Sequence, residues 1–389
     1  MRRSCLITLN ALALVLALLS FAPAPAPVRA EAEEDEVYVL GEIVVKLVNN
    51  DALPGVVADY GLDPLPLDQF GRRPIYRLKI NDGVAPPVKA EQLLKDSQRR
   101  VIYADPNYLA HAPESNGESW AGGESWAGGG DGGGGSYAAQ YAARRLRLAE
   151  AHTITRGAGV SIAILDSGVD AAHPALAGRL IPGYDFVDND NNPSEVGNHQ
   201  QNVTYGHGTH VAGLVALAAP DALLMPLRVL DENGEGNLWV LAEALAFAAN
   251  PDGDPLTDDG VDVINMSIAT KRETDFLEDI IEDLTCNQDE EDDDGEDDDG
   301  EAEEDGCLAG QNGVVIIAAA GNSGMSIREY PAAEDMAGLL AVAASTEVDT
   351  LAAFSTYGRW VSVAAPGEGI LSSVPLDSVP PGAQPYGVW

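Results

Sequence analysis

The second half of the chain alternates short apolar runs with segments of helical character, and this alternation constrains the fold more than any other feature. Six runs rich in Val, Ile, Leu and Ala are typical of buried strands: 156–168, 221–234, 260–269, 312–322, 337–345 and 359–367. Helix-like segments separate several of them, at 208–219, 238–250 and 274–284. Strands that read as continuous apolar runs between helices predict an α/β fold, a doubly wound parallel sheet with helices on both faces. In such folds active sites gather at the carboxyl ends of the strands.

The first third of the chain has a different pattern. Residues 31–112 contain strand-like runs rich in Val, Ile and Tyr at 36–47, 73–80 and 99–112, and a helix-like segment at 86–98. These elements predict a small α+β module ahead of the main domain. Residues 113–136 repeat ESWAGG in tandem and continue into a glycine run, a composition that indicates a flexible linker. The main domain is then expected over 137–389.

The N-terminus has the pattern of an export signal. Two arginines precede an apolar stretch, and residues 1–30 end on a small-residue site typical of cleavage. A membrane anchor is the alternative, but the apolar run is short and leads into a Pro-rich segment. We therefore expect a secreted protein with no membrane association after cleavage. The formal net charge of −40 argues against nucleic acid as a partner, because phosphates are repelled.

Three polar residues stand where strand runs end or a helix-like segment begins. Asp166 ends the run AILD, His207 opens a helix-like segment in YGHGTHVAG, and Asn322 ends the run IIAAAGN. Each is ordinary by itself, since Asp and Asn commonly form turns and a single His is usually structural. Histidine titrates near neutral pH and can move a proton, and a buried carboxylate can orient it. Their order along the chain makes the combination specific.

With these motifs, residues 137–389 resemble the subtilase family of subtilisin-like serine proteases. The resemblance rests on D-S-G at 166–168, H-G-T-H-V-A-G at 207–213 and A-A-G-N at 319–322. It implies a Ser/His/Asp mechanism in which Asp166 orients the base, His207 is the general base, and Asn322 donates to the oxyanion. His210 is implied to be structural.

The chain departs from the family pattern at the nucleophile. The family places its serine in G-T-S-x-A-x-P, shortly after a stretch like that at 363–375, and no G-T-S occurs in these 389 residues. Ser167, Ser267, Ser323 and Ser355 fall in motifs that the family uses for structure or substrate contact, so none is assigned as the nucleophile. We expect the written chain to be inactive, as part of a longer gene product or, alternatively, as a pseudoenzyme.

The resemblance also implies a substrate groove with two backbone edges. One edge is Gly234, Glu235 and Gly236, and the other is Ser267, Ile268 and Ala269. An extended peptide adds between them as a strand. Glu329, in REYPAA, takes a position at the primary specificity pocket and is expected to favour Lys or Arg before the cleaved bond; the alternative is a side chain in solvent. The 31–112 module resembles a subtilase pro-peptide, which makes it a further expected partner of the groove.

Two cysteines, Cys286 and Cys307, enclose an acidic insertion over 286–307. In an exported protein an even pair predicts a disulfide, with two free thiols as the alternative. The enclosed segment carries 14 Asp and Glu residues. A repelling, solvated loop is the favoured interpretation over a calcium site, because the spacing of the acids does not match an EF-hand loop.

No cofactor is expected, and no metal site is assigned, because the usual calcium positions of the family look weakened: Ala175 stands where many members have Asp. The leading hypothesis is a secreted, monomeric serine endopeptidase that acts on proteins or peptides. The alternatives are a catalytically dead protein that keeps the fold to bind peptides, and an acidic surface protein without hydrolytic function.

Overall fold

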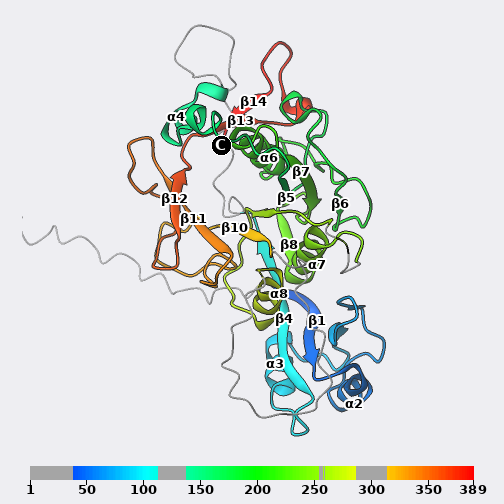
Figure 1. Ribbon diagram of the computed structural model, residues 1–389. Helices are drawn as coiled ribbons and strands as arrows, with labels where there is room; N and C mark the ends of the chain where they lie inside the picture. The colour runs from blue at the N-terminus through cyan, green and yellow to red at the C-terminus, as the bar shows by residue number, and fades with distance from the viewer. Residues whose placement is uncertain (1–37, 113–136, 254–256, 258, 286–312) are drawn as a thin grey trace, which may run out of the picture. The chain divides into compact units, whose positions relative to one another are not determined.

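The computed structural model describes residues 38–112, 137–253, 257, 259–285 and 313–389. Its main feature is a seven-stranded sheet in which every paired neighbour runs parallel (Figure 1). The strands lie in the spatial order β12 (Val363–Pro366), β11 (Leu339–Ser345), β10 (Val315–Ala319), β9 (Val263–Met266), β5 (Ser161–Asp166), β7 (Leu223–Arg228) and β6 (Tyr184–Asp185). Each of the six apolar runs supplies one of these strands.

Helices cover both faces of this sheet, and the alternation of side chains along β5 shows how. Ile162 and Ile164 pack with Ala212 and Ala216 of α6 (His207–Ala218). The intervening residues of β5 face the core that contains α7 (Leu238–Ala249) and α8 (Asp275–Thr285). Successive side chains of a strand point to opposite faces, so α6 lies on one face and α7 and α8 on the other. The predicted doubly wound α/β architecture is confirmed.

The N-terminal module forms a second sheet with antiparallel pairing. Its strands lie in the order β2 (Asp68–Gln69), β3 (Ile75–Lys79), β1 (Tyr38–Leu47) and β4 (Val101–His111). Helices α2 (Leu53–Asp59) and α3 (Pro86–Leu93) belong to the same module. Its separate apolar core includes Ile43, Val45, Leu78 and Leu93. The division of the chain at residue 112 stays a prediction, because residues 38–389 form one compact unit.

A second apolar cluster joins this module to α7 and α8. Phe70 packs edge-on against Trp239 and Phe276, with ring centroids 5.9 and 6.0 Å apart, and Trp239 stacks on Phe276 at 5.6 Å. Lys46 adds an ion pair to Asp279 at 2.7 Å. Aromatic side chains bury large apolar areas, so this cluster is a major source of the free energy that holds the module in place.

Shorter elements complete the described chain. They are η1 (Asn50–Ala52), η3 (Tyr137–Ala139), α4 (Tyr141–Arg145), α5 (Leu148–Ala151), η4 (Pro174–Leu176), β8 (Glu235–Asn237), η5 (Leu376–Ser378) and the hairpin β13 (Leu371–Ser373) with β14 (Tyr386–Val388). Within the described residues, no helix is long and apolar enough to cross a membrane.

Candidate active site

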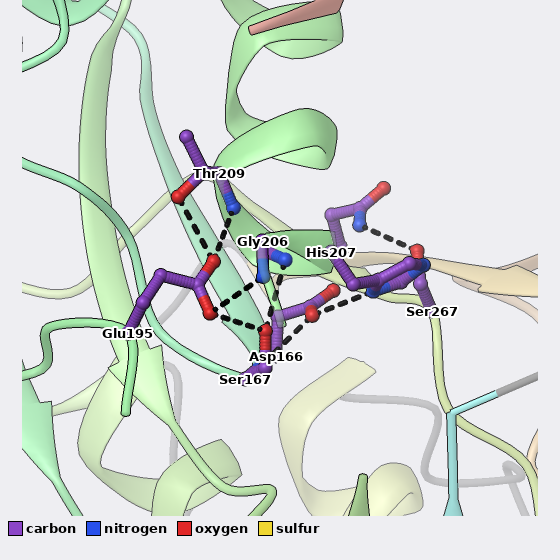
Figure 2. Close-up of polar contacts among 9 residues, drawn as sticks. Asp166, Ser167, Glu195, Gly206, His207, Thr209 and Ser267 are labelled. Carbon is purple, nitrogen blue, oxygen red and sulfur yellow. Dashed lines mark hydrogen bonds and ion pairs between the residues drawn. The ribbon is translucent and has the colours of Figure 1, made fainter. Parts of the chain in front are cut away.

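Asp166 and His207 meet at the carboxyl edge of the parallel sheet. Asp166 is the last residue of β5 and His207 the first of α6. Their side chains are buried, and His207 Nδ1 lies 2.6 Å from Asp166 Oδ1 (Figure 2). Gly206, at φ +93°, turns the chain into the helix, and a Cβ on Gly208 would stand 2.1 Å from the carbonyl oxygen of Gly168. Glycines at both positions let the helix start pack directly on the strand end.

The pair has the geometry of an oriented general base. Because Nδ1 faces Asp166, Nε2 is the nitrogen that can exchange a proton with a reacting group. Asp166 Oδ1 also accepts a hydrogen bond from Ser167 N at 2.8 Å, while its buried Oδ2 has no hydrogen-bond partner in the described part of the chain. An under-satisfied buried carboxylate favours a positive charge beside it, so this arrangement stabilises an imidazolium.

His210 lies one turn further along α6 and has a different environment. Its Nε2 is 3.2 Å from the carbonyl oxygen of Ile370, and burial lowers its pKa to about 3. A histidine held neutral in this way cannot act as a base that cycles near neutral pH. This environment agrees with a structural role.

Asn322 lies in the loop after β10, at the same carboxyl edge of the sheet, and is exposed. Strands β10, β9 and β5 are parallel neighbours, so Asn322 and Asp166 follow or end their strands at the same carboxyl edge of the sheet. The next residue, Ser323, is held by Thr356, with the two hydroxyl oxygens 2.7 Å apart. The role of Asn322 toward an oxyanion stays a prediction.

Glu329 is buried rather than exposed to solvent. Thr356 donates a hydrogen bond to its carboxylate at 3.0 Å, and burial raises the pKa of Glu329. A Cβ built on Gly321 would stand 2.1 Å from Glu329 Oε2. The carboxylate is therefore packed directly against the residue before Asn322.

Both predicted substrate edges are paired with a strand of the chain itself. Strand β4 runs antiparallel to β8, with Ala110 opposite Gly236 and His111 opposite Glu235. On its other side, His111 and Ala269 exchange two backbone hydrogen bonds of 3.0 Å. Ala112 N continues the pattern to Gly234 O at 3.0 Å. Residues 109–112 thus lie between the two edges as an added strand.

The remaining residues of the second edge have structural contacts. Ile268 is buried, and Ser267 Oγ accepts a hydrogen bond of 3.4 Å from Asn265. No group of three or more His, Cys, Asp or Glu suited to a metal ion occurs among the described residues. The predictions for residues 1–30, the linker 113–136, the acidic insertion, and Cys286 and Cys307 lie outside the described residues.

Two features beside the pair were not predicted from the sequence. The Trp389 ring stands edge-on to His207, with centroids 5.2 Å apart. Glu195 reaches the start of α6 from the loop after β6, and its carboxylate bonds to the backbone there. Glu195 lies in a polar stretch without periodicity, so nothing in the sequence distinguishes it from a solvated loop residue.

The sequence and the fold of this chain are similar to those of known proteins. A model of the subtilase family matches residues 157–389. A thermophilic serine proteinase of Bacillus sp. strain AK1 is 32% identical over 351 residues, 87% of this chain and 72% of that protein. Thermitase of Thermoactinomyces vulgaris is 34% identical over 249 residues, 61% of this chain and 74% of thermitase. Among solved structures, fervidolysin from Fervidobacterium pennivorans, described as a keratinolytic enzyme related to subtilisin, matches with a TM-score of 0.61 and 21% identity. That match covers 92% of this chain and 53% of fervidolysin, and it shows the fold.

Proposed function

This chain belongs to the subtilase family of subtilisin-like serine proteases, and on that premise we propose that it supplies the acid, the base and the oxyanion donor of a secreted endopeptidase that cleaves peptide bonds through an acyl-enzyme, with the nucleophilic serine outside these 389 residues. The observation that carries the proposal is the buried 2.6 Å contact between Asp166 and His207 at the carboxyl edge of the sheet. His207 Nε2 takes the proton of the serine hydroxyl and returns it to the leaving amine. Asp166 holds the ring and stabilises its charged form. Asn322 donates to the oxyanion, a contact typically worth about 3 kcal/mol of barrier.

We assign the nucleophile to no serine of these 389 residues. Three of the serines near the motifs already have structural bonds. Ser167 Oγ bonds to Glu195 at 3.0 Å, Ser323 Oγ to Thr356, and Ser355 Oγ accepts from Ala344 N at 2.9 Å. On this assignment the chain as written does not hydrolyse peptides.

A fluorophosphonate probe tests this assignment, because it reacts covalently with an activated serine. The chain of residues 1–389 is expected to remain unlabelled, with His207→Ala as the matched control. Labelling that maps to one of these serines and disappears in H207A would contradict the assignment. Sequencing the gene past codon 389 is the complementary measurement, since a G-T-S-x-A-x-P motif there supports the enzyme.

We further propose that residues 31–112 are an inhibitory pro-region that occupies the groove. The support is the placement of 109–112 between the two substrate edges, because a peptide bound as an added strand gains backbone hydrogen bonds on both sides. A short peptide of the sequence YLAHA added to the intact chain is expected to bind the groove poorly, because residues 109–112 already occupy it. Ready binding of that peptide to the groove would count against an occupied site.

Glu329 is proposed to select Lys or Arg before the cleaved bond. Its buried carboxylate lies against Gly321, next to the proposed oxyanion donor, where a cationic side chain would neutralise it. The test is cleavage of matched Arg and Phe peptides by a chain with an intact nucleophile. Glu329→Gln should reduce the preference for Arg, and equal rates in the parent protein would reject the idea.

A second candidate function is peptide binding without hydrolysis. It is favoured by a groove whose two edges already hold an extended strand. If the gene ends at codon 389, and purified protein binds extended peptides without cleaving them, this candidate replaces the enzyme.

A further inference from the structure

Glu195 lies in the loop between β6 and α6, and its carboxylate points inward to the start of the helix (Figure 2). It accepts four hydrogen bonds. Thr209 N and Thr209 Oγ1 both donate to Oε1 at 2.9 Å. Gly206 N donates to Oε2 at 3.1 Å and Ser167 Oγ at 3.0 Å. A carboxylate with this many donors fixes the segments that carry them, since charge-assisted hydrogen bonds are among the stronger polar contacts.

The four donors belong to the two segments that carry the acid and the base. Gly206 precedes α6 and Thr209 lies in its first turn, on either side of His207 in the chain. Ser167 directly follows Asp166, and its Oγ also accepts a hydrogen bond from Gly208 N at 3.1 Å. The Glu195 side chain therefore connects the end of β5, which carries Asp166, to the beginning of α6, which carries His207.

We propose that Glu195 is a positioning residue for the acid–base pair: its carboxylate holds the Asp166–Ser167 segment and the first turn of α6 in the one arrangement that brings His207 Nδ1 to Asp166. The consequence for catalysis rests on the proposed function. The contact itself exists without turnover, so it is tested separately. Nothing in the serine protease mechanism described above uses Glu195.

The ionisation state of Glu195 affects how strongly it holds these two segments. Burial raises the pKa of Glu195 to about 7, opposed by the hydrogen bonds from Thr209 and Gly206, and the charge of Asp166 raises it further. The titratable groups whose charges interact with it are Asp166 and Tyr205. Protonation would place a hydrogen on one carboxylate oxygen of Glu195, so the side chain accepts all four hydrogen bonds only when it is ionised. The support is accordingly strongest above pH 7, where Glu195 carries its charge.

The experiment is proton NMR of the intact chain, in which the His207 Nδ1 proton shared with Asp166 gives a far-downfield resonance. In Glu195→Gln the amide offers one acceptor oxygen and two donors, so it cannot accept all four bonds. We expect the resonance to move upfield and broaden. We also expect the pH dependence of this resonance near pH 7, which ionisation of Glu195 would give the parent protein, to be lost.

Three further variants make the result decisive. Glu195→Asp keeps the charge and is expected to restore much of the resonance. Ser167→Ala removes the hydrogen bonds of one hydroxyl, to Glu195 and from Gly208 N, and should shift the resonance in a protein that still folds, which keeps the test valid if Glu195→Gln does not fold. Glu243→Gln is the matched control, because burial raises the pKa of Glu243 on α7 to about 7 and its side chain interacts with Trp239 and Asp68 rather than with the Asp166 or His207 segments.

An unchanged resonance with unchanged pH dependence in folded Glu195→Gln, or in Ser167→Ala when Glu195→Gln is unfolded, would overturn the proposal. The same loss in Glu243→Gln would also overturn it, because it would show a general response to removal of a buried carboxylate. A failure of the proposed protease function leaves these readouts intact, since none of them depends on hydrolysis.

Discussion

Glu195 and Asp105 apply the same chemistry at two places in the molecule. Each is a carboxylate that accepts from backbone amides at the start of a helix: Glu195 from Gly206, which precedes α6, and from Thr209 in its first turn, and Asp105 from Phe276 of α8 at 3.0 Å. Burial raises the pKa of each to about 7. Negative charge near a helix N-terminus is favourable, and amides there need an acceptor.

The difference lies in where each carboxylate comes from and how many donors it has. Glu195 precedes its helix by a short loop and satisfies four donors, whereas Asp105 is 171 residues from Phe276 along the chain and accepts one backbone bond. The first contact forms wherever the main domain folds. The second joins two segments that lie far apart in the chain, so it depends on how the N-terminal sheet packs against α8. Removing each carboxylate should separate these two roles.

The largest expected effect is that of Glu195→Ala. It leaves two backbone amides and two hydroxyls without their acceptor in a buried site, and we expect a loss of about 4 kcal/mol in the free energy of unfolding. Urea denaturation followed by circular dichroism measures it. A loss below about 1 kcal/mol would show that water replaces the carboxylate and that Glu195 does not hold the helix start.

Asp105→Asn should have the opposite sign, and only at high pH. The pKa of Asp105 is raised above its unfolded value, so the folded protein binds more protons between about pH 4 and pH 7 and loses stability as the pH rises through that window. Asn keeps an acceptor for Phe276 N but carries no charge. We expect a gain on the order of 2 kcal/mol at pH 8 and none at pH 4.

The same denaturation series on Glu195→Gln sharpens the contrast. Its pKa is raised in the same direction, yet Gln cannot satisfy the donors that the carboxylate does, so at pH 8 this variant should be less stable than the parent. If both neutral variants gain stability at pH 8, desolvation outweighs the hydrogen bonds at both sites. The distinction between the two carboxylates would then fail.

A smaller effect is expected for Asn107→Ala. Asn107 Oδ1 accepts from Trp239 N at 3.1 Å at the start of α7, and its Nδ2 donates to Glu42 at 3.0 Å. Loss of a helix cap costs about 1 kcal/mol, so backbone amides of 109–111 and 235–237 should exchange hydrogen several-fold faster. Exchange in α6 should not change. Faster exchange there would mean that the module also supports the acid–base pair.

The smallest effect belongs to Arg156→Ala, which removes an exposed ion pair to Asp221 at 2.7 Å. Exposed pairs contribute little because water screens them. Unfolding by urea should give the parent value within error. A clear loss would show that charges at the surface of this strongly acidic chain matter more than the buried contacts of Glu195 and Asp105.

Much of the fold follows from patterns that lie within short stretches of sequence. The apolar runs became β5, β7, β9, β10, β11 and β12, because a strand buried on both faces must be apolar at nearly every position. The segment 208–219 became α6 with His207 as its first residue. Short elements such as β6, β8 and α2 have no comparable signal, since they are set by their partners rather than by their own residues.

The residues of the candidate site also fall into those that local motifs indicate and those that only tertiary contacts place there. Asp166 and His207 could be identified because their motifs are local and parallel strands bring their carboxyl ends to one edge. Glu195 could not be identified, because its four bonds depend on the path of a polar loop over the start of α6. The burial of Glu329 likewise depends on contacts with Thr356 and Gly321, which the sequence does not place beside it.

The sequence by itself determined the parallel α/β architecture, because it depends on hydrophobic periodicity, and it placed the predicted acid, base and groove edges through short motifs that resemble those of the subtilase family. Only the tertiary structure decided that residues 109–112 lie between those edges and that Glu195 and Asp105 support different helices. Contacts between segments far apart in sequence depend on how whole elements pack, and that packing is a property of the folded chain rather than of any short stretch of it.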